Sequence, residues 1–458
     1  MKYGKFLPEK GTIGFVAPSF GCNMDPYKTA FENALRRWKR QGYHLDLGPN
    51  CYAGAGIGIS NTPRLCGEEL MAYYLKEDND CLISCGGGEL MCEILDYVDW
   101  EQIASAPAKW FMGLSDNTNM TYLLATICDT ASIYGPCAAS FGMSRQHQSL
   151  KDAFALLSGK GAGWKEAPGD ALDQNPADHD AEQAKAETGL DTDAAKDEMD
   201  HAKGKAGLEM KESHPIFTVS GYPKWELEGK KDEENPLASY NLTERKVLKF
   251  YDGSGRGLPL SNAGSTGAAG TCETGSPAIP GSIAIPESTA ISGSIAIPGA
   301  AALSEEFQVL SGKEIPQTSF SGRLLGGCMD CLVNLLGTRY DYTEVFQEKY
   351  REDGIIWFLE ACDLNVFAIR RAMWQMEHAD WFRYVKGFLI GRPLSALEPM
   401  MGLDRYQAVL DVAGRKGVPV VMDVDLGHLP PAMPLVTGSY TTVHVEGNEI
   451  SVEMEMRP

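Results

Sequence analysis

The sequence predicts an α/β protein whose N-terminal part is built on a parallel sheet. Between Gly11 and Leu157, short β-rich runs alternate with helix-length segments, which is the pattern of βαβ units. The chain has 458 residues, more than a single hydrophobic core usually organises. Its hydrophobic content of 43% is ordinary for a folded protein. These observations together predict at least two globular domains.

The N-terminal domain is expected over residues 1–160, and each of its elements follows from local composition. The β-rich runs are short and apolar, and the segments between them are long enough for helices. The expected strands are TIGFVA (12–17), CLISC (81–85), KWFMGL (109–114) and ASIYG (131–135). The expected helices span residues 27–41, 66–75, 89–97 and 117–128.

Two stretches interrupt this globular pattern. Residues 165–213 carry 14 acidic and 6 basic side chains, a net charge of 6 − 14 = −8, which predicts a solvated insert. Residues 252–304 are rich in Gly, Ser, Ala and Pro, and from Gly275 they follow a six-residue period. Such periods can build a β-helix, but about three hexads are needed per turn and only five are present. We therefore expect an extended loop.

A second domain is expected from the globular sequence that remains, residues 214–250 and 305–458. The first of these segments contains Trp and Tyr residues in an alternating pattern that looks folded. The second contains three apolar runs that predict strands, IIWFLE (355–360), GFLIG (387–391) and VPVVMDV (418–424).

Charge and cysteine usage narrow the range of functions. Forty-one Lys and Arg against 62 Asp and Glu give a net charge of −21, which argues against nucleic-acid and membrane binding. No signal-peptide pattern and no run of about 18 apolar residues occurs, so we expect a cytoplasmic protein. Twelve cysteines are scattered through the chain, which predicts reduced thiols. Cys328 and Cys331 have no second pair to complete a zinc site, and a structural helix is expected there.

Ser115 is the sharpest candidate for a catalytic residue. It lies in KWFMGLSDNT (109–118), where an apolar strand runs through Gly113 into a helix-forming segment. A nucleophile elbow uses this strand-to-helix turn to lift a hydroxyl above the sheet edge. Asn117 stands where the elbow motif has a second glycine, and a serine before a helix can simply be an N-cap.

A glycine turn at Gly86 and Gly87 also follows an apolar strand directly. Glycines let backbone N–H groups approach a ligand closely, so this turn is suited to stabilise an oxyanion or a phosphate. A purely structural turn is the alternative. No GxGxxG or P-loop motif accompanies it. Cys85, just before the turn, permits a rival hypothesis of a thiol nucleophile, although a lone cysteine is more often buried and inert.

His428 and Glu360 are the candidates for the base and acid that a serine nucleophile requires. His428 follows a strand end in MDVDLGHLPPAMP (422–434), where a glycine and two prolines favour an irregular loop that can present an imidazole. Glu360 ends an apolar strand, the position where open α/β sheets place functional groups. The alternatives are an exposed loop histidine and a surface glutamate.

In their order along the chain, these segments resemble the LD-carboxypeptidase family of serine peptidases, which includes muramoyltetrapeptide carboxypeptidases and microcin C immunity peptidases. The resemblance covers nearly all of the chain apart from the two inserts. The segments that carry it are GFVAPS (14–19), CGGG (85–88), MGLSDNT (112–118), GRLLGGCMDCLVNLLGT (322–338), FLEA (358–361) and PVVMDVDLGH (419–428).

The resemblance implies a catalytic triad of Ser115, Glu360 and His428. It further implies an oxyanion hole formed by the backbone N–H of Asp116 and one from the turn at Gly86 and Gly87. A flavodoxin-like N-terminal domain, a smaller β-rich swivelling C-terminal domain, a homodimer, and neither metal nor other cofactor are also implied. The chain departs from the family pattern at Cys85, where Arg or a similar residue is usual, and at Ala361, where an acid is common.

The implied activity is hydrolysis of an L,D-amide bond that releases a terminal D-amino acid from a muropeptide, as in peptidoglycan recycling. The partner is then a small peptide or amide. PKWELEG (223–229) resembles the immunity-peptidase branch, in which an aromatic residue stacks on a nucleobase; Trp225 is the candidate, and packing is its alternative role. The competing hypotheses are a microcin C-type peptidyl- or aminoacyl-nucleotide hydrolase and a catalytically silent binding protein on the same scaffold.

Overall fold

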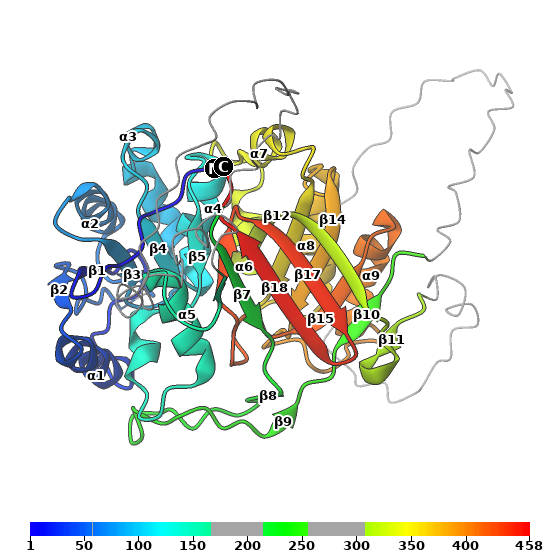
Figure 1. The fold of residues 1–458 in the computed structure, drawn as a ribbon, viewed down its shortest axis with the longest axis horizontal. Coiled ribbons are helices and arrows are strands. Elements are labelled where there is room, and N and C mark those ends of the chain that lie inside the picture. Colours follow the sequence, from blue (N-terminus) through cyan, green and yellow to red (C-terminus); the bar gives the residue numbers. More distant parts are fainter. Residues whose placement is uncertain (57, 166–213, 255–306) are drawn as a thin grey trace, which may run out of the picture.

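Two β-sheets, each with helices packed around it, form the described part of the protein (Figure 1). The computed structural model describes residues 1–56, 58–165, 214–254 and 307–458. Apart from 165 and 252–254, the two predicted inserts at 165–213 and 252–304 lie outside the described residues. The α/β class, with a parallel N-terminal sheet and a second, β-rich part, is as predicted.

The first sheet has six strands in the order β16-β5-β4-β3-β1-β2, and all neighbouring pairs except β16–β5 are parallel. Its short central strands are almost completely buried, because helices cover both faces of a parallel sheet. Its strands from the N-terminal region are β1 (Thr12–Val16), β2 (His44–Leu47), β3 (Cys81–Ser84), β4 (Trp110–Gly113) and β5 (Ser132–Tyr134).

The helices of this region agree with the prediction except between β3 and β4. The observed elements are α1 (Tyr27–Arg40), α2 (Pro63–Leu75), η1 (Met91–Tyr97), α3 (Trp100–Ser105), η2 (Ser115–Asn117), α4 (Thr118–Thr126), η3 (Ala138–Gly142) and α5 (Gln148–Ser158). The α-helix expected at 89–97 is wrong: η1 is a 3₁₀ segment that begins two residues later. Gly88 has φ +131° and the N–H of Glu89 bonds to Gly58, so these residues extend the turn instead.

The second sheet has ten strands in the order β11-β10-β15-β14-β13-β12-β17-β18-β7-β6. Strands β12 to β15 are parallel to one another, and antiparallel strands flank them on both sides. The strands are β6 (Trp164–Lys165), β7 (Ile216–Ser220), β10 (Lys249–Tyr251), β11 (Leu310–Ser311), β12 (Thr318–Cys328), β13 (Ile355–Glu360), β14 (Val385–Gly391), β15 (Val420–Val424), β17 (Tyr440–Glu446) and β18 (Glu449–Glu455).

The helices of the second region follow or connect its parallel strands. They are α6 (Met329–Leu335), α7 (Thr343–Lys349), α8 (Val366–His378) and α9 (Arg405–Ala413), with short 3₁₀ segments η6 (Gly312–Glu314) and η7 (Gly414–Lys416). A separate small hairpin pairs β8 (Lys224–Trp225) with β9 (Glu244–Arg245). Cys328 ends β12 and only Cys331 lies in a helix, so this pair spans a strand-to-helix junction rather than one helix.

Two short strands cross the predicted domain boundary. β16 (Leu435–Thr437) comes from the C-terminal region but pairs with β5 at the edge of the first sheet. β6 comes from the end of the N-terminal region but pairs with β7 at the edge of the second. Leu435 and Val436 are fully buried, so this apolar segment covers the open edge of β5 and removes its own side chains from water. These exchanges tie the two regions together.

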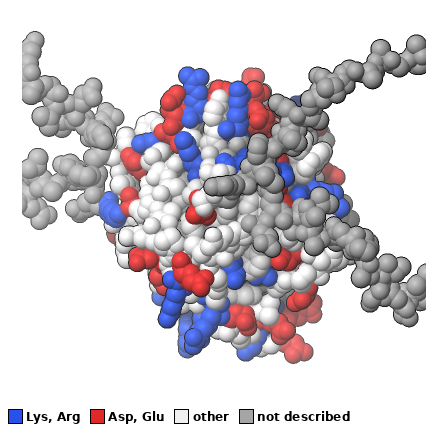
Figure 2. Space-filling model, turned by 90° about the vertical axis from the view of Figure 1, so that its right-hand side faces the viewer, with Lys and Arg blue, Asp and Glu red and all other residues white. Residues whose placement is uncertain are grey.

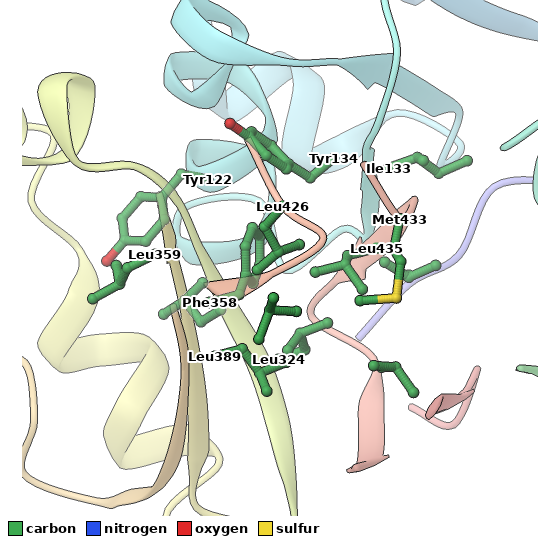
Figure 3. Packing of buried hydrophobic residues seen from close by; sticks show 14 of the residues in the cluster. Tyr122, Ile133, Tyr134, Leu324, Phe358, Leu359, Leu389, Leu426, Met433 and Leu435 are labelled. Carbon is green, nitrogen blue, oxygen red and sulfur yellow. The ribbon is translucent and has the colours of Figure 1, made fainter. Parts of the chain in front are cut away.

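One hydrophobic core runs from the first sheet into the second. In Figure 3, Tyr134 and Ile133 of β5 lie close to Phe358 of β13 and to Leu435 of β16. Further out, Tyr122 of α4 stacks on Trp381 with ring centroids 5.5 Å apart, and Trp381 stacks on Trp357 of β13 at 5.6 Å. This aromatic stack holds α4 against β13 and so sets the distance between the two elements.

The surface shows no separation of charge on the face drawn in Figure 2, where acidic and basic side chains are interspersed outside the grey atoms. None of the helices in the described ranges combines the length and the apolar character that a transmembrane span requires.

Candidate active site

Ser115, His428 and Glu360 meet where the carboxyl ends of parallel strands from both sheets face each other. Ser115 Oγ lies 2.8 Å from His428 Nε2, and His428 Nδ1 lies 2.8 Å from Glu360 Oε2. The carboxylate can only accept, so Nδ1 carries a proton; when the imidazole is neutral, Nε2 accepts from the serine hydroxyl. The three predicted residues, 313 positions apart at the extremes, therefore form one hydrogen-bonded relay.

The backbone at Ser115 has the strained conformation of a nucleophile elbow. Its φ is +65°, in the left-handed region that costs a non-glycine residue about 1–2 kcal/mol. β4 ends two residues earlier at Gly113, where a Cβ would lie 2.6 Å from the Cβ of Asn117. The tight turn thus requires the glycine, and it presents the hydroxyl above the end of the sheet.

Asn117, the departure from the elbow motif, has a structural role that its type explains. Its side chain is fully buried, and Nδ2 donates to the carbonyl oxygens of Gly86 at 2.8 Å and Leu114 at 3.0 Å. A glycine could form neither bond. Asn117 therefore joins the serine turn to the neighbouring glycine turn.

The turn at Gly86 and Gly87 faces the serine hydroxyl. A Cβ on Gly87 would lie 3.3 Å from Ser115 Oγ, and the N–H of Phe20 holds the Gly87 carbonyl at 2.7 Å. The backbone N–H groups of Asp116 and Gly87 donate to no acceptor among the described residues. They are therefore available to a ligand beside Ser115, as the predicted oxyanion hole requires.

Glu360 is fully buried at the end of β13, rather than exposed at a strand terminus. Tyr134 donates to its Oε1 at 2.6 Å, while the N–H of Ser115 donates to the Tyr134 hydroxyl at 3.3 Å. Tyr134 thus links the acid to the nucleophile turn. Sequence reasoning missed it, although a polar side chain at the carboxyl end of an apolar strand, in SIYG (132–135), was a usable signal.

The pKa values of Glu360 and His428 follow from the burial of the two side chains and from their proximity. Burial by itself raises the pKa of Glu360, but the charge of His428 and the hydrogen bonds from His428 and Tyr134 hold it below its usual value. Burial also lowers the pKa of His428, but the Glu360 carboxylate and the Cys362 thiol together outweigh this effect and raise that pKa well above 6.5. Each residue of the pair therefore favours the charged form of the other.

The loop that carries His428 is held by a glycine and by a buried ion cluster. Gly427 has φ +89°, and a Cβ there would lie 2.4 Å from Glu360 Oε2. Before it, Asp425 is fully buried and accepts from Arg392 Nη2 at 2.9 Å, and Lys246 Nζ lies 3.6 Å away. A buried carboxylate needs such partners. Sequence reasoning missed this cluster because its members are far apart in the chain.

Two pockets open onto Ser115. The larger, of about 440 Å³, is lined by the Gly86–Gly88 turn, His428, Lys231 and the aromatic pair Phe20 and Tyr27. The smaller, of about 100 Å³, lies on the other side and is lined by residues of η1, α4, β12 and α6. Ser115 is thus accessible from two directions, with His428 in the larger pocket alone.

Two other predicted candidates take no part in the relay, although Cys85 belongs to the lining of the larger pocket. Cys85 is fully buried, and burial raises the pKa of its thiol well above the usual value, which argues against a thiolate nucleophile. Trp225 lines neither pocket; the guanidinium of Arg392 lies 5.1 Å from its ring centroid. Its role in substrate binding stays a prediction.

One group of side chains in the described part could offer donor atoms to a metal ion, Cys328, Glu360 and His428, whose donors lie within 4.8 Å of one another. Two of these donors are already joined by the Glu360–His428 hydrogen bond. Metal binding here would therefore compete with the relay.

Fold and site together define a two-domain α/β protein in which serine, histidine and a buried glutamate form one relay, the arrangement of serine hydrolases. Residues 13–135 match the family model of the LD-carboxypeptidase N-terminal domain, and residues 321–443 match that of the LD-carboxypeptidase C-terminal domain. The chain belongs to the LD-carboxypeptidase family, as the sequence predicted.

Solved structures agree on the fold. The microcin C7 self-immunity protein MccF is similar with a TM-score of 0.61 at 16% identity, covering 99% of this chain and 98% of that one. An MccF-like protein from Bacillus anthracis gives 0.63 at 14% identity with full coverage of both chains. Muramoyltetrapeptide carboxypeptidase from Oxalobacter formigenes gives 0.56 at 13% identity, covering 98% and 99%. No curated protein matches the sequence significantly.

Proposed function

We propose that the chain is a serine peptidase that releases a terminal D-amino acid from a small peptide by hydrolysing an L,D-amide bond. The observation that carries the proposal is the unbroken relay from Ser115 Oγ through His428 to the buried Glu360, each link at 2.8 Å. Membership of the LD-carboxypeptidase family supports the substrate class.

In the proposed mechanism His428 takes the hydroxyl proton as Ser115 Oγ attacks the carbonyl carbon. The N–H groups of Asp116 and Gly87 hold the oxyanion, and Glu360 stabilises the imidazolium. The C–N bond then breaks as His428 gives its proton to the leaving amine. Water, deprotonated by His428, releases the acyl group and restores Ser115.

The position of Lys231 is evidence that the leaving group carries a negative charge. Of the residues that line the two pockets in the described part, it is the only Lys or Arg. Its ammonium lies 5.4 Å from the ring centroid of Tyr27 in the larger pocket, on the same side of Ser115 as His428. A leaving D-amino acid carries a carboxylate that this ammonium would attract.

A nucleotide amide is the second candidate, and the aromatic pair of the larger pocket favours it. The rings of Phe20 and Tyr27 lie 5.2 Å apart and offer a surface on which a base could stack. The similar protein MccF has been solved with adenosine monophosphate and with aspartyl sulfamoyl adenosine. Trp225, predicted for this role, is not among the residues that line this pocket.

The test is to incubate the purified full chain with an L,D-tetrapeptide and with an aminoacyl sulfamoyl adenosine and to identify products by mass spectrometry. We expect D-Ala release from the first, abolished in Ser115→Ala with unchanged unfolding. Cleavage of the aminoacyl sulfamoyl adenosine alone would show that the enzyme hydrolyses nucleotide amides instead. Cleavage of neither, together with failure of a serine-directed acylating reagent to label Ser115, would favour a silent binding protein.

We further propose that the enzyme acts in the cytoplasm, in peptidoglycan recycling, as a homodimer. Light scattering of the full chain tests the last point, with a monomer mass as the contrary result.

A further inference from the structure

Three side chains with different metal-binding atoms meet at the relay. The donor atoms of Cys328, Glu360 and His428 all lie within 4.8 Å of one another, and the described part of the chain contains no second cluster of this kind. Cys328 is 1% exposed and Glu360 is fully buried, whereas the side chain of His428 is 16% exposed. A thiol, a carboxylate and an imidazole are the donor types that zinc sites use.

The backbone places these donors before any ion binds. β12 and β13 are parallel, and Cys328 is the register partner of Glu360 at the ends of the two strands. Neighbouring strands lie about 5 Å apart, and register partners point to the same face of the sheet. His428 is added from the loop after β15, where Gly427 leaves room for Glu360 because it lacks a Cβ. The cluster is therefore fixed by the fold and not by chance orientations of mobile side chains.

The spacing of the three donors suits a zinc ion. Zinc binds sulfur at about 2.3 Å and imidazole nitrogen or carboxylate oxygen at about 2.0–2.2 Å, so donors around a tetrahedral ion lie about 3.3–3.6 Å apart. His428 Nδ1 and Glu360 Oε2 are 2.8 Å apart, and the sulfur of Cys328 lies within 4.8 Å of a donor atom of each. Displacements of about 1 Å therefore bring the three donors to zinc-binding distances.

Charge and access also favour a divalent cation. A thiolate and a carboxylate together balance the two charges of Zn²⁺, which a buried ion requires. Cys328 gives up a hydrogen bond to Asp330 at 3.3 Å. The N–H groups of Cys362 and Asp363 continue to donate to that carboxylate, at 3.0 and 2.9 Å. Cys328 lines the smaller pocket, His428 the larger one and Cys362 both, so an ion has a route from solvent and a further thiol beside it.

We propose that Cys328, Glu360 and His428 form an inhibitory binding site for Zn²⁺. Zinc replaces the thiol proton of Cys328 and the Nδ1 proton of the doubly protonated His428, and both protons leave to solvent. The imidazole then keeps its single proton on Nε2, which donates and can no longer accept the proton of Ser115. The ion is therefore an inhibitor and not a cofactor. This site goes beyond the proposed function and does not depend on which bond the enzyme cleaves.

Cobalt binding tests the site without any substrate. Co²⁺ accepts zinc-like ligand sets, and a cobalt–thiolate bond absorbs in the near ultraviolet by charge transfer. We expect a titration of the full chain, freed of metal and kept reduced, to produce this band up to one equivalent, and Zn²⁺ to displace it. Cys328→Ser should abolish the band. Cys331→Ser should keep it and is the matched control, because Cys331 is also buried and close by but lies outside the cluster. A band of equal strength in both variants, or none in the unsubstituted chain, would overturn the proposal.

Inhibition is measured as the rate at which a serine-directed acylating reagent labels Ser115, which needs no knowledge of the substrate. We expect Zn²⁺ to slow the labelling, a chelator to restore it and Mg²⁺, which prefers oxygen donors, to have no effect. Loss of even an outer partner of a metal ligand lowers metal affinity about 10- to 100-fold, so half-inhibition of Cys328→Ser should need at least about 10-fold more zinc than that of Cys331→Ser.

The contrary results are equal zinc sensitivity of the two variants, or equal effects of zinc and magnesium. If Cys328→Ser does not fold, His428→Ala replaces it in the cobalt titration and should weaken cobalt binding at least about 10-fold by the same reasoning; unchanged binding would exclude the site. Failure of Ser115 to react in the zinc-free chain would count against the proposed function alone, because the cobalt titration decides the metal site independently.

Discussion

Gly427→Ala tests the positioning of the relay with a single methyl group. The added Cβ would lie 2.4 Å from Glu360 Oε2, while ordinary contacts begin at 3.4 Å, so one group has to move by 3.4 − 2.4 = 1.0 Å. The carboxylate is fully buried and is bonded to His428 at 2.8 Å, so this displacement acts directly on the relay. A misplacement of about 1 Å can lower the rate about 100-fold. We expect a loss in kcat/KM of that order.

The stability change has two parts that a control can separate. A left-handed alanine costs about 1–2 kcal/mol, and overpacking adds about 1–3 kcal/mol, so we expect a decrease of about 2–5 kcal/mol in the free energy of unfolding. Gly402→Ala is the matched control, because φ is +85° there, against +89° at Gly427, and nothing lies within 4 Å of its Cβ. In that variant only the cost of the left-handed backbone, about 1–2 kcal/mol, should appear.

The assay is denaturant unfolding of both variants together with kcat/KM on the peptide substrate. The contrary result is a Gly427→Ala variant that loses no more stability than Gly402→Ala and keeps an unchanged kcat/KM. That result would mean that the His428 loop does not position Glu360.

Three further predictions concern the chemistry of the relay. Only neutral His428 can accept the serine proton, and its pKa is raised, so kcat/KM should increase with pH and reach half of its plateau above pH 6.5. Glu360→Gln should move this midpoint to lower pH and reduce the plateau. Tyr134→Phe removes a 2.6 Å hydrogen bond to the buried Glu360 carboxylate and should lower kcat about 10- to 100-fold. Tyr73→Phe is the control and should leave kcat unchanged, because the Tyr73 hydroxyl bonds the backbone carbonyl of Leu47. Equal kcat values in the two variants would contradict a role of Tyr134 in positioning Glu360. Cys85→Ala should retain most activity in the same assay, and its complete loss without unfolding would revive the thiol hypothesis.

The sequence was sufficient for the elements and for the three residues of the relay. Strands β1, β3, β4 and β13 appear within two residues of the predicted bounds, because apolar runs between polar turns depend mainly on local composition. Ser115, Glu360 and His428 were predictable because each lies at or soon after the end of a strand, and the order of the family motifs joined them. Burial, which no local pattern reveals, argues against the rival hypothesis of Cys85 as the nucleophile.

The contacts between segments far apart in the chain depend on the tertiary structure and could not be read from the sequence. Tyr134 and Glu360 are separated by 226 positions, and β16 completes a sheet whose other strands end 300 residues earlier. The two pockets beside Ser115 likewise combine residues of the N-terminal and C-terminal regions of the chain. Local composition determines which segments form strands and where polar groups emerge, but charge compensation and access depend on packing between segments. The three residues of the relay were therefore predictable from sequence, while the contacts that position them and the pockets around them were not.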